Sequence, residues 1–169
     1  MSNLAVKRLT KEANDMARCE IPLISASPDE NGNLFKWTFS ITGPEDTLFE
    51  SGIFQGEILF PPTYPLTPPT VKFTTRIYHP NVYPSGELCI SILHPPVHDE
   101  FGYESIEERW SPAQSVSSIL LSTLSLLSDI NVESPANVDA ARCYRENFDE
   151  FKERVRECVA ESLDEDNWA

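Results

Sequence analysis

The sequence predicts an α+β fold in which a four-stranded antiparallel meander lies between an N-terminal helix and a group of C-terminal helices. Four short runs with strand patterning follow one another with only turns between them, whereas helical periodicity is confined to the two ends of the chain. A length of 169 residues with 40% hydrophobic content provides one core of ordinary size. We therefore expect residues 1–169 to form a single domain.

The first helix is expected at residues 3–18. Its apolar residues approximate one stripe: Leu4, Val6, Leu9, Ala13, Met16 and Ala17. Its basic residues make it the one clearly basic element of the chain: Lys7, Arg8, Lys11 and Arg18. From the residues alone, a solvated helix face and a docking surface explain this cluster equally well.

The strands are expected at residues 23–26, 34–41, 52–60 and 70–73. The second alternates apolar and polar residues along its length, and Asp29-Glu30-Asn31-Gly32 before it is typical of a turn. Segment 61–69, between the last two strands, contains five prolines. Proline lacks the N–H that a strand ladder needs, so this segment is predicted to be a stiff loop with Leu66 near its tip.

Helical patterning returns after residue 110. Ser111-Pro112 is predicted to cap a helix at 113–127, in which four apolar residues are spaced for burial: Val116, Leu120, Leu124 and Leu127. Two more helices are expected after a turn at 131–135, at residues 136–148 and 149–163. The stretch 74–110 shows little periodicity, and it holds the residues of greatest chemical interest.

The chain is strongly acidic, with a formal net charge of −14 and a pI near 4.5. Nucleic acids and anionic membranes attract basic proteins, so neither is an expected partner, and partners with a basic face are favoured. The N-terminus is a charged helical pattern rather than a signal peptide, and no run approaches the length of a membrane span. We therefore expect a cytoplasmic or nuclear protein with reduced thiols.

The four cysteines show neither a CxxC pair nor a zinc-ligand spacing, so no metal and no cofactor are expected. Three of them are predicted to be buried structural thiols: Cys19, Cys143 and Cys158. Cys89 is the exception, because it follows a Ser85-Gly86 turn on a short extended piece of chain, eight residues after Asn81. An asparagine can hydrogen-bond a developing oxyanion without changing its protonation. Cys89 and Asn81 are thus the candidate nucleophile and amide donor.

The histidines are the candidate bases for this cysteine. His79 precedes Pro80 in a loop and is interpreted as a structural residue that bonds local backbone. His94 and His98 flank Pro95-Pro96 and are interpreted as solvated loop residues. No Cys–His register is evident, which disfavours a cysteine hydrolase, but spacing along the chain does not exclude a pair in space.

Essentially the whole chain resembles the ubiquitin-conjugating enzymes. The matching residues are, in order, Val6-Lys7-Arg8-Leu9, Phe60-Pro61-Pro62-Thr63-Tyr64-Pro65, Pro68-Pro69, His79-Pro80-Asn81, Cys89 and Trp110-Ser111-Pro112. The interval from Cys89 to Trp110 is roughly a dozen residues longer than in compact family members, a length that is usually functional or disordered. This acidic insertion, at about residues 94–108, resembles that of the subclass serving endoplasmic-reticulum-associated degradation.

The resemblance implies the family's fold and a thioester relay. Cys89 would accept the C-terminus of ubiquitin from the activating enzyme and pass it to a lysine amine with a RING-type ligase bound, for proteasomal degradation. Asn81 would stabilise the oxyanion, and Ser134 would occupy a gate after the central helix. The attacking lysine must lose a proton, and serine is a weak acceptor. We therefore expect help from the inserted loop: His94, His98, Asp99, Glu100, Glu104, Glu107 and Glu108.

The resemblance also implies partner surfaces. Contacts with the activating enzyme and the ligase are expected at Lys7, Arg8, Lys11, Leu66, Ser111, Pro112 and Ala113. Leu66 stands where family members often have phenylalanine, which bears on the choice of RING partner. Leu121 would hold donor ubiquitin, helped by Asn131. A ligase could recruit this cytoplasmic enzyme to the endoplasmic reticulum surface, and a nuclear location is also compatible.

Three alternatives remain open at this point. One is a conjugating enzyme for a ubiquitin-like modifier, the second an inactive binding module on the same scaffold, and the third a cysteine hydrolase. The presence of both Cys89 and Asn81 argues against the inactive module. Formation of a ubiquitin adduct that thiol reductants destroy would separate these possibilities.

Overall fold

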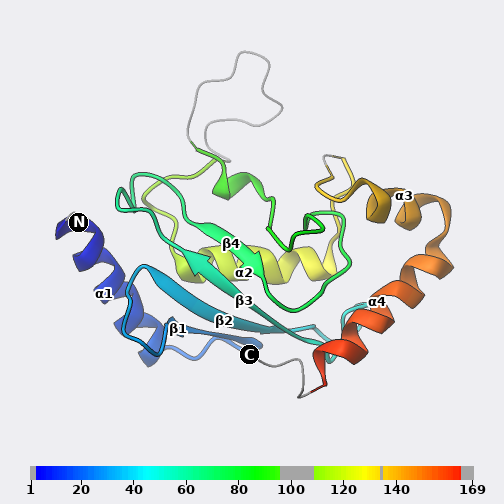
Figure 1. Cartoon of the computed structure of the whole chain (residues 1–169), viewed down its shortest axis with the longest axis horizontal. Helices are drawn as coiled ribbons and strands as arrows, with labels where there is room; N and C mark the ends of the chain where they lie inside the picture. Colours follow the sequence, from blue (N-terminus) through cyan, green and yellow to red (C-terminus); the bar gives the residue numbers. More distant parts are fainter. Residues whose placement is uncertain (1–2, 96–108, 134, 165–169) are drawn as a thin grey trace, which may run out of the picture.

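Four antiparallel strands form one sheet, whose order β1-β2-β3-β4 follows the chain (Figure 1). The computed structural model describes residues 3–95, 109–133 and 135–164. The strands are β1 (Ile24–Pro28), β2 (Lys36–Thr42), β3 (Ile53–Leu59) and β4 (Thr70–Phe73). The predicted α+β fold and its four-stranded meander are confirmed.

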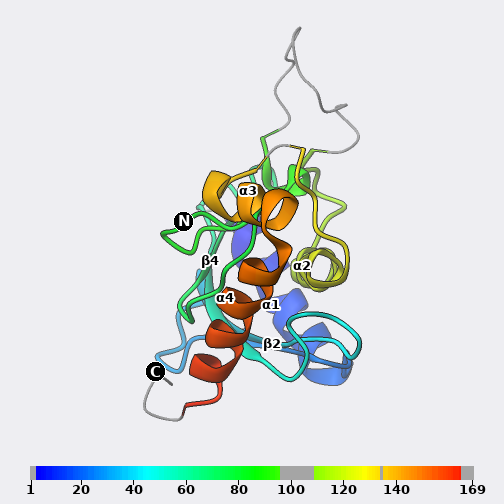
Figure 2. The ribbon, with the colours of Figure 1, turned by 90° about the vertical axis from the view of Figure 1, so that its right-hand side faces the viewer.

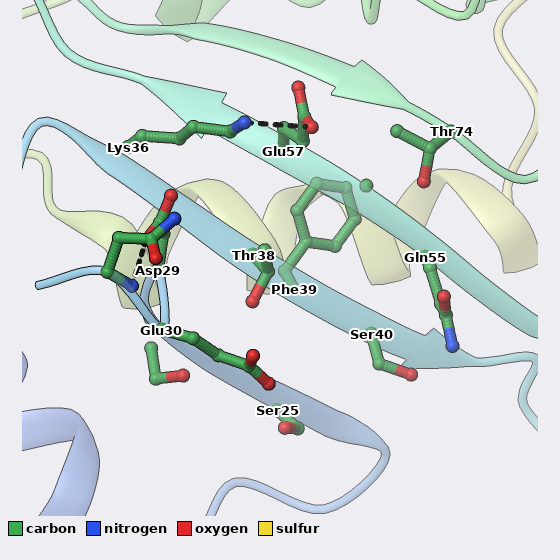
Figure 3. Close-up of a pocket in the computed structure, with 13 residues that line it drawn as sticks. Ser25, Asp29, Glu30, Lys36, Thr38, Phe39, Ser40, Gln55, Glu57 and Thr74 are labelled. Atoms are coloured by element: carbon green, nitrogen blue, oxygen red, sulfur yellow. Dashed lines mark hydrogen bonds and ion pairs between the residues drawn. The ribbon is translucent and has the colours of Figure 1, made fainter. Parts of the chain in front are cut away.

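The two faces of the sheet differ as the alternation in β2 predicts. Trp37, Phe39 and Ile41 point into the core, where Ile58 and Phe54 of β3 pair with the first and last of them. Lys36, Thr38 and Ser40 point to the other face, which is open and polar (Figure 3). On that face the Lys36 ammonium lies 3.4 Å from the Glu57 carboxylate of β3.

The helices cover the apolar face and the two ends of the sheet. They are α1 (Asn3–Arg18), α2 (Val116–Ser128), α3 (Val138–Glu146) and α4 (Phe148–Ser162), with a short 3-10 helix η1 (Ser91–Leu93). In Figure 1, α2 runs behind the sheet, with α1 at one end and α3 and α4 at the other. Figure 2 shows α2 end-on beside the sheet. Among these helices of the described residues, none is long and apolar enough to cross a membrane.

The central helix begins three residues later than predicted. The backbone N–H of Val116 donates to the Glu12 carboxylate (2.7 Å), so it cannot bond the Pro112 carbonyl as a helix starting at 113 would require. That carbonyl accepts instead from Arg8 (2.9 Å). Ser115 therefore caps α2, in a reciprocal capping box with Ser118.

A single residue separates the last two helices. The backbone N–H of Asn147 donates to the Cys143 carbonyl at the end of α3 (2.8 Å), and its side chain accepts from the N–H of Glu150 at the start of α4 (3.3 Å). The predicted pair of helices is present, but the boundary lies at 147 rather than between 148 and 149.

The predicted burial of the structural thiols holds for two cysteines out of three. Cys143 and Cys158 are buried in α3 and α4, whereas Cys19 is exposed. Cys19 follows the last residue of α1, outside the apolar stripe that faces the core. The prediction is therefore wrong for Cys19.

Candidate active site

A tight turn brings Cys89 back beside Asn81. The N–H of Tyr83 donates to the Glu87 carbonyl (2.9 Å), the N–H of Gly86 donates to the Tyr83 carbonyl (2.8 Å), and the N–H of Cys89 donates to the Asn81 carbonyl (2.9 Å). Gly86 has a φ of +98°, and a Cβ there would lie 2.3 Å from the Phe73 carbonyl oxygen. Only glycine fits this turn. The turn explains why eight residues separate the asparagine from the cysteine.

His79 holds the loop before Cys89 through both ring nitrogens. Its Nδ1 accepts from the backbone N–H of Asn81 (2.9 Å), so the ring proton is on Nε2 and donates to the Leu126 carbonyl of α2 (2.9 Å). His79 is 1% exposed, and this burial lowers its pKa to about 4. The ring is therefore neutral at physiological pH and serves as a fixed bridge between the loop and α2.

The side chain of Asn81 is buried and oriented from the segment that follows α2. Its Oδ1 accepts from the backbone N–H of Asn131 (3.2 Å), which leaves the two amide hydrogens as its donors. The carbonyl of Pro80 accepts from the backbone N–H groups of Ala136 (2.8 Å) and Asn137 (3.0 Å). The His-Pro-Asn loop is thus fastened to the chain on both sides of residue 134.

The sulfur of Cys89 is partly exposed and has two polar neighbours. Its Sγ lies 3.7 Å from Nε2 of His94. The other neighbour is the Tyr83 hydroxyl, whose pKa is raised first by the charge of the thiolate form of Cys89 and then by a hydrogen bond to it. Sequence reasoning missed Tyr83, although its position between Asn81 and Cys89 was a usable signal.

The position of His94 differs from the solvated one expected. The 3-10 turn η1 carries the chain back, with the N–H of His94 donating to the Ser91 carbonyl (2.9 Å), and the half-buried imidazole lies beside Cys89. A spatial Cys–His pair therefore exists that chain spacing did not indicate. The N–H of Trp110 donates to the His94 carbonyl (3.0 Å) and closes the base of the insertion.

Several predicted site residues lie outside the described residues: His98, Asp99, Glu100, Glu104, Glu107, Glu108 and Ser134.

Most of the residues expected to bind partners are exposed. Lys7, Lys11, Pro112 and Ala113 are exposed, Ser111 is half-buried, and Leu66 is 60% exposed at the tip of its proline-rich loop. On α2 itself, Leu121 is 47% exposed. The side-chain oxygen of Asn131 accepts from the backbone N–H of Glu133 (3.0 Å), and its expected help to Leu121 stays a prediction.

Arg8 is engaged within the molecule. Its guanidinium donates to the carbonyls of Pro112 (2.9 Å) and Gln114 (2.6 Å) and pairs with Glu12 (3.0 Å). Arg8 therefore joins α1 to the 112–114 segment, and its expected contact with the activating enzyme and the ligase stays a prediction.

Glu12 is a buried acceptor that sequence reasoning missed. Besides Arg8, its carboxylate accepts from the N–H of Val116 and from the Tyr64 hydroxyl. Burial, followed by the bond to Glu12, raises the pKa of Tyr64. A carboxylate in the apolar stripe of α1 was the available signal, because a buried charge needs partners of this kind.

Comparison with known proteins identifies the class that this fold and cysteine-centred loop define. The family description "Ubiquitin-conjugating enzyme" matches residues 8–159. The chain belongs to the ubiquitin-conjugating enzyme family, and it is an E2 enzyme. Partners of this family in general are ubiquitin, a ubiquitin-activating enzyme and a ubiquitin ligase.

The chain is similar along nearly its whole length to named members of the family. It is 49% identical to ubiquitin-conjugating enzyme E2 13 of Arabidopsis thaliana, over 96% of this chain and 98% of that protein. It is 48% identical to E2 15 of Schizosaccharomyces pombe, with coverage of 96% and 98%. It is 47% identical to E2 G2 of Homo sapiens, with coverage of 96% and 99%.

Proposed function

We propose that Cys89 carries ubiquitin as a thioester. Its thiolate attacks the carbonyl carbon of the ubiquitin C-terminus on the activating enzyme, a new C–S bond forms, and the activating enzyme's thiolate leaves. The supporting observation is the double anchoring of Asn81, whose main-chain carbonyl accepts from Cys89 while its side-chain oxygen is held by Asn131. Its amide N–H groups are then the donors for the oxyanion of the tetrahedral intermediate.

In the second step a lysine amine attacks the same carbonyl carbon. A C–N bond forms, the C–S bond to Cys89 breaks, and the proton lost by nitrogen passes to the departing sulfur or to water. A RING-type ligase would hold the charged enzyme and the substrate together, and the modified substrate would go to the proteasome. A ligase at the endoplasmic reticulum surface would bring a cytoplasmic enzyme to its substrates there.

The test is formation of the adduct in a mixture of the enzyme, ATP, activating enzyme and ubiquitin. We expect a product on a non-reducing gel that thiol reductant removes and that Cys89→Ala abolishes. Cys19→Ala is the matched control, because Cys19 is also an exposed thiol and lies outside the site. An adduct that survives in Cys89→Ala, or none in the wild type, contradicts the proposal. Charging by a ubiquitin-like modifier alone would favour that alternative.

We further propose that His94 and the inserted loop help the attacking lysine lose its proton. The imidazole of His94, 3.7 Å from the sulfur, is placed to accept a proton near the reacting carbonyl or to return one to the leaving sulfur. Deleting residues 95–106, or replacing His94 with glutamine, should slow discharge of the thioester to free lysine much more than charging of Cys89. Equal losses in both steps contradict this role.

The Cys89–His94 contact would also be present in a cysteine hydrolase, and the two functions differ in the group that accepts ubiquitin. In a hydrolase the thioester would discharge to water without an added amine. We expect the charged enzyme to release ubiquitin faster as free lysine increases, measured by the decay of the thioester. A decay rate independent of lysine would favour hydrolysis.

Partner binding is proposed for two exposed surfaces. Exposed Leu66, Lys7 and Lys11 would contact the ligase, and exposed Leu121 would hold donor ubiquitin against α2. Leu66→Ala should weaken binding of a RING ligase and so reduce stimulation only while the ligase is limiting. Leu121→Ala should reduce stimulation even at saturating ligase. The two variants are compared by titrating the ligase into a lysine-discharge assay.

A further inference from the structure

Three side chains from three parts of the chain form a closed cluster behind the His-Pro-Asn loop, which we call the clasp: Tyr78, Asp139 and Arg154. The Tyr78 hydroxyl donates to Oδ2 of Asp139 (2.6 Å). Nη1 of Arg154 donates both to the Tyr78 oxygen (3.0 Å) and to the same Asp139 oxygen (2.7 Å). Each member therefore bonds the other two.

The clasp joins three elements that also meet through other contacts, among them the ring pairs Tyr78–Phe151 and Tyr144–Phe151. Tyr78 immediately precedes His79, Asp139 lies in the first turn of α3, and Arg154 lies on α4. The guanidinium carbon of Arg154 also lies 5.1 Å from the centre of the Tyr78 ring, whose other neighbour is Phe151 of the core. An acidic residue in the first turn of a helix is itself favoured by the helix dipole.

The protonation states that the clasp needs are favoured by its own contacts. The bond from Tyr78 holds the pKa of Asp139 below its usual value, so the carboxylate stays ionised. Burial, followed by the bond to Asp139, raises the pKa of Tyr78, so its hydroxyl keeps the proton that it donates. The other charged groups that face the cluster are Glu150, which pairs with Arg154 at 3.3 Å, and Arg142.

The clasp lies next to the two backbone contacts that orient Asn81. Asn137, whose N–H donates to Pro80, is also the cap of α3, and its side chain accepts from Ala140 (3.0 Å). If the first turn of α3 moves, this cap moves with it, and the contact with Pro80 lengthens. The clasp therefore fixes the distance between α3 and the loop that carries Asn81.

We propose that Tyr78, Asp139 and Arg154 are positioning residues for the lysine-attack step, acting through the orientation of Asn81. This inference rests on the proposed role of Asn81 as the oxyanion donor. Two of the three side chains are open to solvent: Asp139 is 66% exposed and Arg154 is 39% exposed. Exposed ion pairs of this kind contribute little to stability, so their effect should be visible in the chemistry rather than in unfolding.

The first test compares Arg154→Gln with wild type in two assays of the full chain. We expect discharge of the charged enzyme to free lysine to fall about three- to tenfold, which is part of the loss that removal of a whole oxyanion donor causes. Charging should stay within about twofold, because exchange between two thiolates has a lower barrier than attack by a lysine amine that must first lose its proton, and so depends less on the exact orientation of Asn81. Arg154→Lys, which keeps one ionic contact with Asp139, should restore part of the loss.

The matched control is Arg156→Gln. Arg156 lies two residues further along α4 and pairs with Glu153 (2.6 Å) at the surface, without contacting Tyr78 or α3. Its discharge rate should equal that of the wild type. If Arg154→Gln instead lowers the unfolding midpoint in urea and leaves discharge unchanged, the clasp is only a helix-packing contact and the proposal is overturned.

The second test asks whether the clasp acts through Asn81. In an Asn81→Ala background, Arg154→Gln should have no further effect on discharge, because the group that it orients is gone. An equal fold-loss in both backgrounds overturns the mechanism. Failure of the wild type to form a thioester would contradict the proposed function instead, so the two failures are distinguishable.

Discussion

The two ends of α2 are held to the rest of the molecule by different polar groups, a buried charged group at one end and a neutral group at the other. At its N-terminal end the buried carboxylate of Glu12 accepts from the helix itself, from Tyr64 and from Arg8. At its C-terminal end the Leu126 carbonyl accepts from His79, a neutral imidazole. A helix of 13 residues separates the two ends by about 20 Å.

This difference matches what each end adjoins. Beside Cys89, a fixed charge would bias both the thiolate and the oxyanion, and the neutral imidazole of His79 joins the loop to α2 without adding one. At the far end, a carboxylate can serve as a central acceptor because Arg8 compensates its charge. The catalytic end of α2 is thus built for orientation and the other end for rigidity.

The largest effect is expected at the neutral end, in Asn81→Ala. Loss of one oxyanion donor should slow discharge to lysine about 10²- to 10³-fold. Asn81→Asp should be at least as slow, because it places a negative charge where the oxyanion forms. Single-turnover decay of the thioester measures both. Asn31→Ala, in the exposed turn before β2, is the control, and a loss below tenfold in Asn81→Ala would contradict the role of the amide.

At the charged end, Glu12→Gln should act on stability. The amide offers two hydrogens where the carboxylate accepted three bonds, and it leaves Arg8 uncompensated, so the free energy of unfolding should fall by about 2–3 kcal/mol. Urea unfolding measures this, with the exposed Glu20→Gln as control. An unchanged midpoint in Glu12→Gln would show that the carboxylate is not the centre of that end.

A smaller effect follows from the protonation of His79. Its pKa is about 4 in the folded state and 6.5 in the unfolded state, so below pH 6.5 the unfolded chain binds a proton that the folded protein does not. Stability present above pH 6.5 is therefore lost as the pH falls toward 4, by about 2 kcal/mol between pH 7.5 and pH 5.

The imidazole itself reports this effect. In NMR spectra recorded from pH 7.5 to pH 5, the ring signals of His79 should stay at their neutral positions. The free energy of unfolding, measured in urea across the same pH range, should depend less on pH in His79→Gln than in the wild type. Ring signals that titrate near pH 6.5 would show that the neutral end is not protected from protonation.

The smallest effect is expected for Arg8→Lys. A single ammonium cannot reach both the Pro112 and Gln114 carbonyls while it pairs with Glu12, so about 1 kcal/mol or less of unfolding free energy should be lost. Lys7→Gln, on the exposed side of α1, should lose nothing measurable. Equal urea midpoints for Arg8→Lys and Lys7→Gln would mean that the several contacts of the Arg8 guanidinium add nothing to stability.

Elements with a periodic pattern could be predicted because each residue's environment follows from its neighbours. The alternation in β2 and the apolar stripe of α1 are examples, and the sheet order followed from the short turns. The start of α2 could not be predicted, because Arg8 and Glu12, about a hundred residues away, take the carbonyl and the N–H that an earlier start needs.

In the candidate site, too, the features set by local sequence could be predicted and those set by distant residues could not. Asn81 and Cys89 could be singled out because a turn of fixed length joins them. The contact of His94 with Cys89 depends on a short 3-10 turn that no periodicity announces, and the clasp depends on a tyrosine and an arginine that are 76 residues apart. Side chains that meet only through tertiary packing leave no local pattern in the sequence.

The shared cap at Asn147 constrains how this chain can tolerate insertions. Because one residue ends α3 and begins α4, a single residue inserted there would turn α4 by about 100° about its axis. Phe151, Val155 and Cys158 would then leave the core together, and Arg154 would face away from Tyr78. Changes in length should therefore be far better tolerated elsewhere on the surface than at this joint, where one added codon would misalign a whole helix.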